Sequence, residues 1–379
     1  MGRCRMKRAW LSMAVVMFSI DMRADQRLAI FPSLDLTEVS DNNLNFSPEK
    51  PLRDRVRRIT PTLGLRFASP RWSVRGSYGL DSEHFSNHPS LDDDRARERA
   101  GISIQYQAAP RLTLSIDGGY LDTNTLADLN VDTGLAASRV RGRRLSVSPS
   151  ARFRISPKVT AITSASSLTT NVVNGNSIRS QVQTLVVERR VSPRDVFDID
   201  YEHSHLVFNG ETSQTINTHT LLAGWSRQLG MHDSVALHVG PRVTDSSRSA
   251  DVSASLTHTW RLSSMAISLL RNQTTVIGYV GAVDTESVQA KFSFALNRRL
   301  TAYASPAILR STNRQLEGTV YRIAVGARYA VTTLLGADVA YSRDMQNGAI
   351  DPVRANAKFS RATLSVGLTT RLSNPDRMR

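Results

Sequence analysis

Two clusters of side chains are of the types that bind metal ions. The denser one is the Asp-Asp-Asp run at 92–94, which arginines follow closely. Carboxylate oxygens are the ligands that Ca²⁺ prefers, but no EF-hand spacing or acidic repeat accompanies this run. The second cluster is His203 and His205, which would share one face of a strand but have no evident third ligand. We therefore expect no metal site, and we interpret the acidic run as a solvated outside loop.

Nucleophilic catalysis is the other chemistry that these residue types allow. Serine, histidine and aspartate are all present, but no nucleophile-elbow spacing, phosphate-binding loop or dinucleotide-binding glycine fingerprint occurs. The only cysteine is Cys4, so the chain beyond its first residues has no cysteine nucleophile, cysteine metal ligand or disulfide. The sequence predicts no catalytic residues and no cofactor.

A larger set of charged and polar residues alternates with apolar ones. Clear examples are the segments 72–75, 102–106, 112–117, 197–201 and 364–368, whereas helical spacing is weak throughout. Successive side chains of a strand point to opposite faces, so each such segment would have one apolar face and one polar or charged face. The elements that position the charged residues are therefore predicted to be half-buried strands.

Short turns separate these strands at regular spacing. Four of them are near copies: Ser69-Pro70-Arg71, Ala109-Pro110-Arg111, Ser156-Pro157-Lys158 and Ser192-Pro193-Arg194. Proline lacks a donor N–H and fits a tight turn better than a central strand. The spacing continues without proline at 230–231, 263–264, 297–298 and 332–333. The sequence thus predicts eight short turns.

Longer polar segments lie between the short turns, for example at 39–57, 84–97, 122–141 and 345–354. Tight turns at one end and long loops at the other are typical of a transmembrane barrel. Such a sheet must close, because in hydrocarbon every backbone N–H and C=O needs a partner within the protein. Eight turns with a first strand at 27–38 and a last one at 359–373 predict an all-β fold, a single closed antiparallel transmembrane β-barrel of about eighteen strands. Sixteen strands is the nearest alternative, and a soluble exported β-protein is the competing class.

The first 24 residues differ from the rest of the chain. A basic start precedes an apolar run at 9–20, which is the pattern of a secretory signal peptide. The run is shorter than the roughly 20 residues that a membrane-spanning helix needs. We expect a signal peptide at 1–24 and an outer-membrane β-barrel at 25–379.

The chain is strongly basic, with a formal net charge of +15. The predicted signal contains five basic residues and one acid, so the remaining chain has a net charge of +11. Such a charge suits nucleic acid, anionic lipid or an anion path. A nucleic-acid partner is not expected behind a signal peptide, which leaves lipid or a channel.

Three segments carry a family resemblance: LTEVSDNNLN at 36–45, ITPTLGL at 59–65 and WSVRGSY at 72–78. Together they resemble the opening of outer-membrane β-barrel porins, more narrowly of barrels encoded beside exopolysaccharide and exosortase gene sets. The resemblance implies a barrel in the bacterial outer membrane and a role in the passage of polysaccharide or small solutes. It offers no catalytic residues to carry over.

Alternation also assigns the charged residues that would face the lumen. A basic residue facing lipid at the bilayer midplane costs about 2–4 kcal/mol, so the charges are expected to point inward. The basic set is Arg66, Arg75, Arg152, Arg154, Lys291, Arg322 and Arg328; the acidic set is Asp117, Asp198, Asp200, Glu202 and Asp338. Charged rings in a pore bias ion selectivity, which predicts a mildly anion-favouring channel. The alternative is that these charges only hydrate the lumen and pair with one another.

The predicted function is a porin-like outer-membrane channel for small solutes or ions, without enzyme activity. One alternative is a structural or export component of an envelope exopolysaccharide system, its lumen plugged by a loop such as 122–141. A third is an enzyme with its site at the barrel rim. The expected partners are outer-membrane lipid or lipopolysaccharide, the barrel assembly machinery and, in the export alternative, polysaccharide export proteins.

Overall fold

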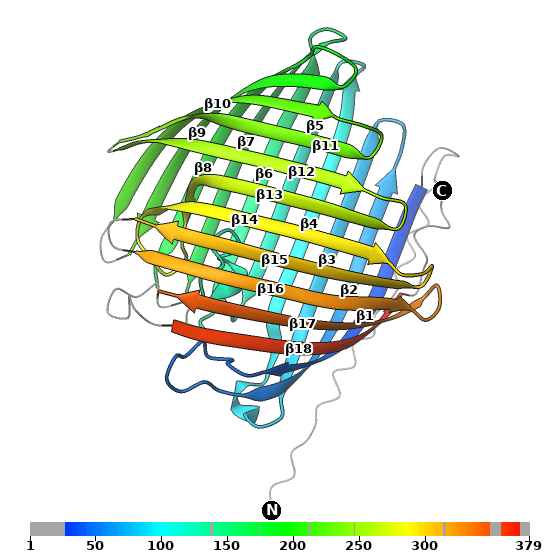
Figure 1. The fold of residues 1–379 in the computed structure, drawn as a ribbon, viewed down its shortest axis with the longest axis vertical. Coiled ribbons are helices and arrows are strands. Elements are labelled where there is room, and N and C mark those ends of the chain that lie inside the picture. The colour runs from blue at the N-terminus through cyan, green and yellow to red at the C-terminus, as the bar shows by residue number, and fades with distance from the viewer. Residues whose placement is uncertain are drawn as a thin grey trace, which may run out of the picture.

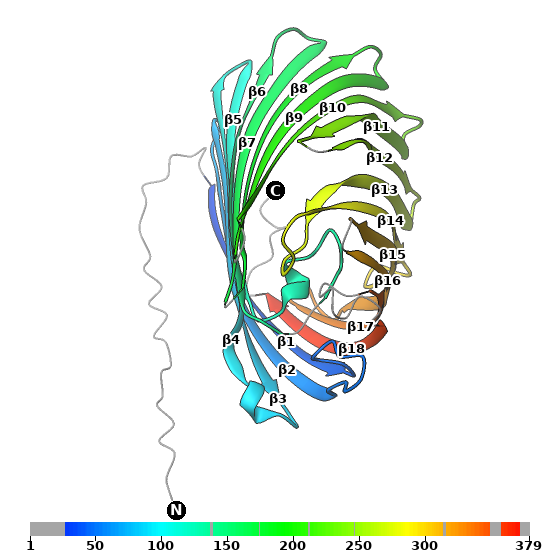
Figure 2. The same cartoon turned by 90° about the vertical axis from the view of Figure 1, so that its left-hand side faces the viewer.

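The computed structural model describes residues 27–136, 139–173, 175–210, 213–245, 247–313, 316–348 and 358–371. These form eighteen antiparallel strands in one sheet, which closes into a barrel (Figures 1 and 2). The fold class predicted from the sequence is confirmed, with eighteen strands rather than sixteen. The predicted signal peptide at 1–24 lies outside the described residues.

Each strand pairs with its neighbours in the chain, and β1 pairs with β18 to close the ring. The strands are β1 Arg27–Asp41, β2 Asp54–Ala68, β3 Trp72–Phe85, β4 Asp93–Ala109, β5 Leu112–Thr123, β6 Gly142–Arg154, β7 Val159–Val172, β8 Ser177–Arg190, β9 Asp195–Asn209, β10 Gln214–Gln228, β11 Asp233–Thr244, β12 Ser247–Thr259, β13 Ser263–Thr275, β14 Ala282–Ala295, β15 Leu300–Thr312, β16 Glu317–Ala330, β17 Leu335–Asn347 and β18 Lys358–Arg371.

Two single-turn 3₁₀ helices occur between strands, η1 Pro89–Leu91 and η2 Leu126–Asp128. In the described part of the chain, no helix has the length and apolar character needed to span a membrane.

The eight short turns lie at one end of the barrel, the right-hand edge of Figure 1, which we call the turn end. Seven of them are where the sequence predicted. The sixth is at 260–262, just before the predicted Ser263-Ser264, because the Trp260 N–H donates to the Ser263 carbonyl at 2.7 Å and closes the turn there. The other end, which we call the loop end, carries the long connections β1–β2, β3–β4, β5–β6 and β17–β18, together with short ones such as β11–β12.

Strands extend further toward the loop end than predicted. β1 continues to Asp41 instead of position 38, and β4 begins at Asp93. Most of the charged cluster at 92–99, which we interpreted as an outside loop, therefore belongs to β4. Arg97 and Arg99 of this strand pair with Asp81 of β3, at 3.7 and 3.2 Å. Because of these ion pairs, strand pairing continues through charged residues toward the loop end.

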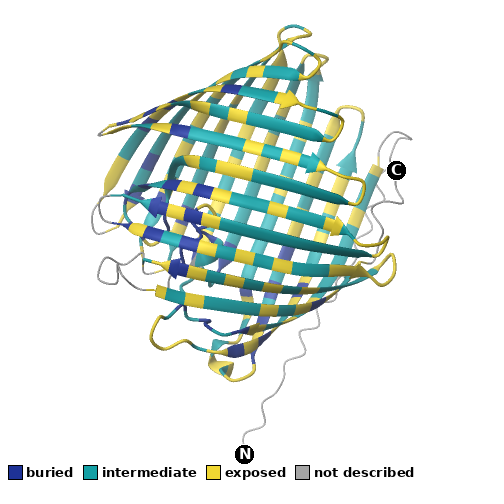
Figure 3. Ribbon diagram, in the orientation of Figure 1, coloured by how far each residue is buried: buried dark blue, intermediate teal, exposed yellow. Residues whose placement is uncertain are grey.

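Large apolar side chains cover the outer surface. Ile199 is 60% exposed and Val366 57% exposed, and comparable residues occur on nearly every strand. Trp72 stacks on Tyr106 at 4.3 Å near the turn end, where interfacial aromatic residues are typical. A closed sheet with this apolar surface has the architecture of an outer-membrane barrel, since hydrocarbon is the environment that suits both features. The buried residues lie mainly toward the loop end (Figure 3).

Candidate functional site

The inner wall of the barrel can be followed strand by strand. Directly paired residues of neighbouring strands point to the same face, so the face opposite the exposed apolar residues forms one continuous inner wall. All of the charges predicted to face the lumen lie on this wall: Arg66, Arg75, Arg152, Arg154, Lys291, Arg322, Arg328, Asp117, Asp198, Asp200, Glu202 and Asp338. Their role in ion selectivity stays a prediction.

Toward the turn end, the inner wall is basic and open to water. Arg66 and Arg75 stand directly opposite one another on β2 and β3. Arg152 is 3.5 Å from Glu188 across β7. Exposed inner-wall cations without an ion pair among the described residues include Arg66, Arg75, Arg154, Arg190, Lys291 and Arg328. Inner-wall cations outnumber the inner-wall carboxylates, such as Glu188 and Asp338, in this half of the lumen, which gives it a net positive potential.

Toward the loop end, inner-wall charges occur mainly as ion pairs. The pairs, with their N–O distances, are Arg58–Glu83 at 2.6 Å, Arg242–Asp251 at 2.6 Å, Arg322–Asp344 at 2.8 Å and Arg361–Asp41 at 2.5 Å. Each pair joins strands that are neighbours in the sheet. These charges hold the wall together and largely cancel one another. The two halves of the lumen thus differ in electrostatic character.

The connection between β5 and β6, described at residues 124–136 and 139–141, folds into the barrel, and we call these residues the inward loop. Figure 2 shows it within the ring of strands, beside the β13–β14 connection. Arg97 of β4 binds Asp128 at 2.6 Å, and Arg144 of β6 donates to the Leu129 carbonyl. The Ile277 N–H of the β13–β14 connection donates to Asn130 Oδ1 at 2.7 Å.

Two buried leucines anchor the inward loop on different walls. Leu129 packs with Ile178 of β8 and with Leu206 and Phe208 of β9. Leu135 packs with residues of β14, β15 and β16, namely Val283, Leu309 and Val320. Because β9 and β15 are far apart in the sheet order, the loop crosses the lumen between them.

The inward loop continues to further strands after Leu135. The Ala136 N–H donates to Gln346 Oε1 of β17 at 2.9 Å, and Arg139 binds Glu83 of β3 at 3.2 Å. This segment lies within the loop that the sequence offered as a plug, and the structure places it in the lumen. It narrows the loop-end half of the barrel.

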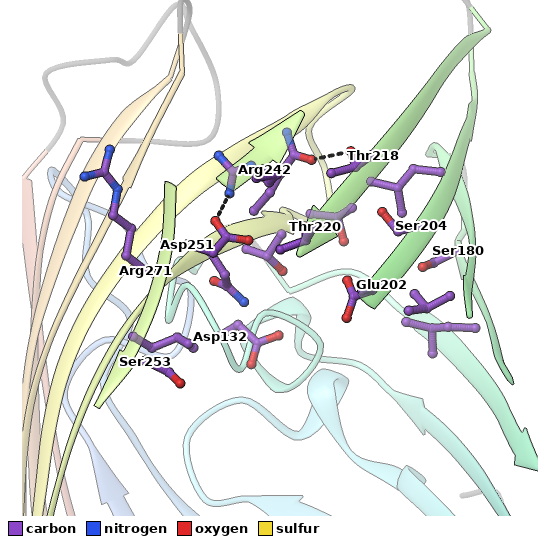
Figure 4. A pocket seen from close by; sticks show the side chains of 18 of the residues that line it. Asp132, Ser180, Glu202, Ser204, Thr218, Thr220, Arg242, Asp251, Ser253 and Arg271 are labelled. Atoms are coloured by element: carbon purple, nitrogen blue, oxygen red, sulfur yellow. Dashed lines mark hydrogen bonds and ion pairs between the residues drawn. The ribbon is translucent and has the colours of Figure 1, made fainter. Parts of the chain in front are cut away.

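A cavity of about 310 Å³ lies between the inward loop and the wall of β8 to β13 (Figure 4). Asp132 of the loop and Glu202 of β9 border it. On the barrel wall of the cavity, the buried Arg242 side chain forms an ion pair with Asp251. The predicted acidic residues Asp200 and Glu202 thus come together in one cavity, and neither forms an ion pair among the described residues.

Some polar atoms of this cavity are buried without a hydrogen-bond partner: Arg144 Nε, Asp200 Oδ1 and Asn272 Oδ1. Buried polar atoms are normally satisfied by protein, water or ligand. The lining offers donors and acceptors to a small polar solute or to water.

The predicted residues that do not join the cavity are spread along the inner wall. Asp117 is beside Ser103 and Ser148, and Asp338 is opposite Arg328. Sequence reasoning missed Arg242, Asp251 and the anchors Asn130 and Leu135. The available signal was the number of apolar residues, among them Leu129 and Leu135, in a segment predicted to be a loop.

The two histidines considered as half of a metal site face outward. Their strand positions alternate with the inward Glu202, and His203 stacks on His219 at 4.5 Å. Across the ranges that the structure describes, no group of three His, Cys, Asp or Glu side chains could hold a metal ion.

Comparison with known proteins gives similarity in structure only. No protein-family profile matches the chain, and no curated protein matches it in sequence. Among solved structures, the outer membrane protein OpdK from Pseudomonas aeruginosa is 12% identical, with 90% of this chain and 99% of that chain covered and a TM-score of 0.48. OccAB4 from Acinetobacter baumannii is 8% identical, with 93% and 100% covered and a TM-score of 0.48.

A third similar structure is the siderophore receptor PirA from Pseudomonas aeruginosa. It is 9% identical, with 91% of this chain and 80% of that chain covered and a TM-score of 0.45. Identities this low say nothing of solute or partner, which have to be inferred from the chain's own residues.

Proposed function

We propose that the chain is a porin-like outer-membrane channel that passes small solutes and ions with a mild preference for anions. The observation that carries this proposal is the inner wall of the turn-end half, where the exposed arginines other than Arg152 have no ion pairs among the described residues. This half presents hydrated cations to the lumen, which favours passage of anions.

The inward loop would set the width of the channel. It crosses the lumen at the loop end and is held by ion pairs, an amide hydrogen bond and two buried leucines. Solutes would pass beside it, along a wall that includes the cavity of Figure 4. The acidic residues there would moderate the anion preference that the turn end creates.

A second candidate is a structural or export component of an envelope exopolysaccharide system, with the barrel plugged at rest. The crossing of the lumen by the inward loop favours it, because the loop contacts strands on both sides of the barrel. In that case the loop would have to move before anything passed. Lipopolysaccharide and the barrel assembly machinery would be partners in either case.

The test is planar-bilayer conductance of the refolded protein under a salt gradient. A channel should give steady unitary currents with a reversal potential on the anion side. A folded barrel that never conducts, even after the inward loop is released by substitution, would contradict the channel. Conductance that appears only after release would favour the plugged export component.

A further inference from the structure

The turns at the turn end share a chemical feature besides their shape. Six of the eight contain a cation and none contains an acid, although Asp195 and Asp233 begin the strands that follow two of them. The cations are Arg71, Arg111, Lys158, Arg194, Arg261, Arg298 and Arg299, all exposed and none in an ion pair among the described residues. We call this set the turn rim. A tight turn needs proline, glycine or a short polar side chain, but it does not need arginine, so turn geometry leaves the charge unexplained.

The turn rim is continuous with the basic half of the inner wall. Arg71 lies in the turn that joins Arg66 and Arg75, and Lys158 lies in the turn directly after Arg154. Arg190 is the last residue of β8 and faces the lumen, and Arg194 lies in the turn that follows it. The cations therefore run from the barrel edge into the lumen as one surface.

We propose that this surface docks a linear polyanion, a chain with repeated carboxylates or phosphates, that approaches the channel from the turn end. The inference rests on the proposed function, because it states from which side of the membrane a solute would enter the proposed channel. Short turns face the periplasm in bacterial barrels, so the polyanion would come from that side. Many separated cations suit a polymer better than a small anion, since only a polymer can contact several turns at once.

Anionic lipid headgroups are the competing occupant of such a rim. They could reach the turns from outside the barrel, but they cannot reach Arg66, Arg75 and Arg154 on the inner wall. The same surface continues over these residues, so a soluble chain that can bend into the lumen fits it better. The loop end offers no equivalent, because its inner-wall charges are mainly paired.

The first experiment measures binding of fluorescent poly-L-glutamate to the protein refolded in neutral detergent, where neither lipid charge nor conduction enters. One variant carries Arg71→Gln, Arg111→Gln, Lys158→Gln and Arg194→Gln. Its matched control removes the same charge from exposed loop-end cations, with Lys50→Gln, Arg53→Gln, Arg179→Gln and Arg248→Gln. We expect the turn-rim variant to bind on the order of tenfold more weakly at low salt, and the control to bind within about twofold of the parent. Equal losses in the two variants would overturn the proposal.

The second experiment adds poly-L-glutamate to one side of a single channel and then to the other. Block should need several-fold less polymer from one side, and this asymmetry should disappear in the turn-rim variant but persist in the control. Symmetric block of the parent channel would also overturn the proposal. A parent that binds the polymer in detergent but never conducts would reject the proposed channel and leave the docking surface standing.

A third measurement separates polymer from lipid. If the turn-rim variant loses binding to vesicles that contain phosphatidylglycerol, yet keeps its affinity for poly-L-glutamate, the rim is a headgroup contact and the proposal is wrong. We expect the reverse: the turn-rim variant should lose affinity for poly-L-glutamate and should bind the vesicles as the parent does.

Discussion

At the scale of single residues, ion pairing decides what an inner-wall charge can do. Arg322 and Arg328 are both on the inner face of β16, but Arg322 has Asp344 at 2.8 Å whereas Arg328 has no ion pair among the described residues. Alternation along a strand predicted the face of both residues. It could not predict the pairing, because a cross-strand partner depends on the register of two strands and on side-chain reach.

Selectivity should depend on the unpaired cations of the turn end. We expect Arg152→Glu with Arg154→Glu to move the reversal potential under a salt gradient toward cations. The reason is that four units of charge change on one stretch of the inner wall, and Arg154 has no carboxylate to cancel it. The measurement is the reversal potential in planar bilayers at low and high salt, since screening should reduce the shift.

A matched control uses the outer face at the same height. Arg189 is exposed, lies near the turn end of β8 and faces away from the lumen. Arg189→Glu should leave the reversal potential close to that of the parent, whereas Arg154→Glu alone should shift it. Equal shifts from these two single variants would show that the inward assignment of β6 is wrong.

At the scale of elements, the turns were predictable and the path of the inward loop was not. Ser156-Pro157-Lys158 determines its turn locally, because proline fixes its own φ and cannot donate to a ladder. The loop depends on distant contacts. Asn130, for example, bonds to Ile277, which is 147 positions away in the chain. The sequence named the segment as a plug candidate, but only the folded ring supplies the pockets for its leucines.

The inward loop should be released by removing its two leucine anchors. Leu129 and Leu135 are almost completely buried, and truncation of a buried leucine typically costs about 2–5 kcal/mol. We expect Leu129→Ser with Leu135→Ser to raise the unitary conductance, or to add large current fluctuations, because the loop would leave the lumen part of the time. The barrel should keep its folded mobility on cold gel electrophoresis.

The same loop provides its own control. Val131 lies between the two anchors but is 62% exposed, so Val131→Ser should leave both conductance and current noise unchanged. If the anchor variant conducts like the parent while its barrel remains folded, the inward loop does not limit the passage. We would then place the narrowest point on the inner wall itself.

At the scale of the whole molecule, closure depends on the one strand pair that joins the two ends of the barrel. β1 and β18 pair from Ser33 with Arg371 to Asp41 with Thr363. Side chains reinforce the loop end of this seam. Asn42 and the backbone of Ala362 exchange hydrogen bonds at 3.2 and 2.7 Å, and Arg361 binds Asp41 at 2.5 Å. The need of every backbone N–H and C=O in hydrocarbon for a partner predicted closure from the sequence, whereas these seam contacts required the register.

The Arg361–Asp41 pair should matter more to the barrel than an ordinary surface ion pair. The Asp41 side chain is 1% exposed, so Arg361→Gln leaves a buried carboxylate whose remaining hydrogen-bond donor among the described residues is the Asn43 N–H at 2.9 Å. We expect a loss of about 3 kcal/mol in the free energy of unfolding, near the low end of the cost of removing one partner from a buried pair. Urea unfolding followed by tryptophan fluorescence would measure this loss.

Arg310→Gln is the control for this prediction. Arg310 and Glu317 also pair across neighbouring strands, at 3.0 Å, but both are more than half exposed, so their pair should contribute less than about 1 kcal/mol. Equal effects would mean that the seam is held by its backbone ladder alone. A larger effect at Arg361 would mean that the barrel is locked at the loop end of the seam between its first and last strands, at the opposite end from the turn rim, so that polyanion docking and closure could be altered independently.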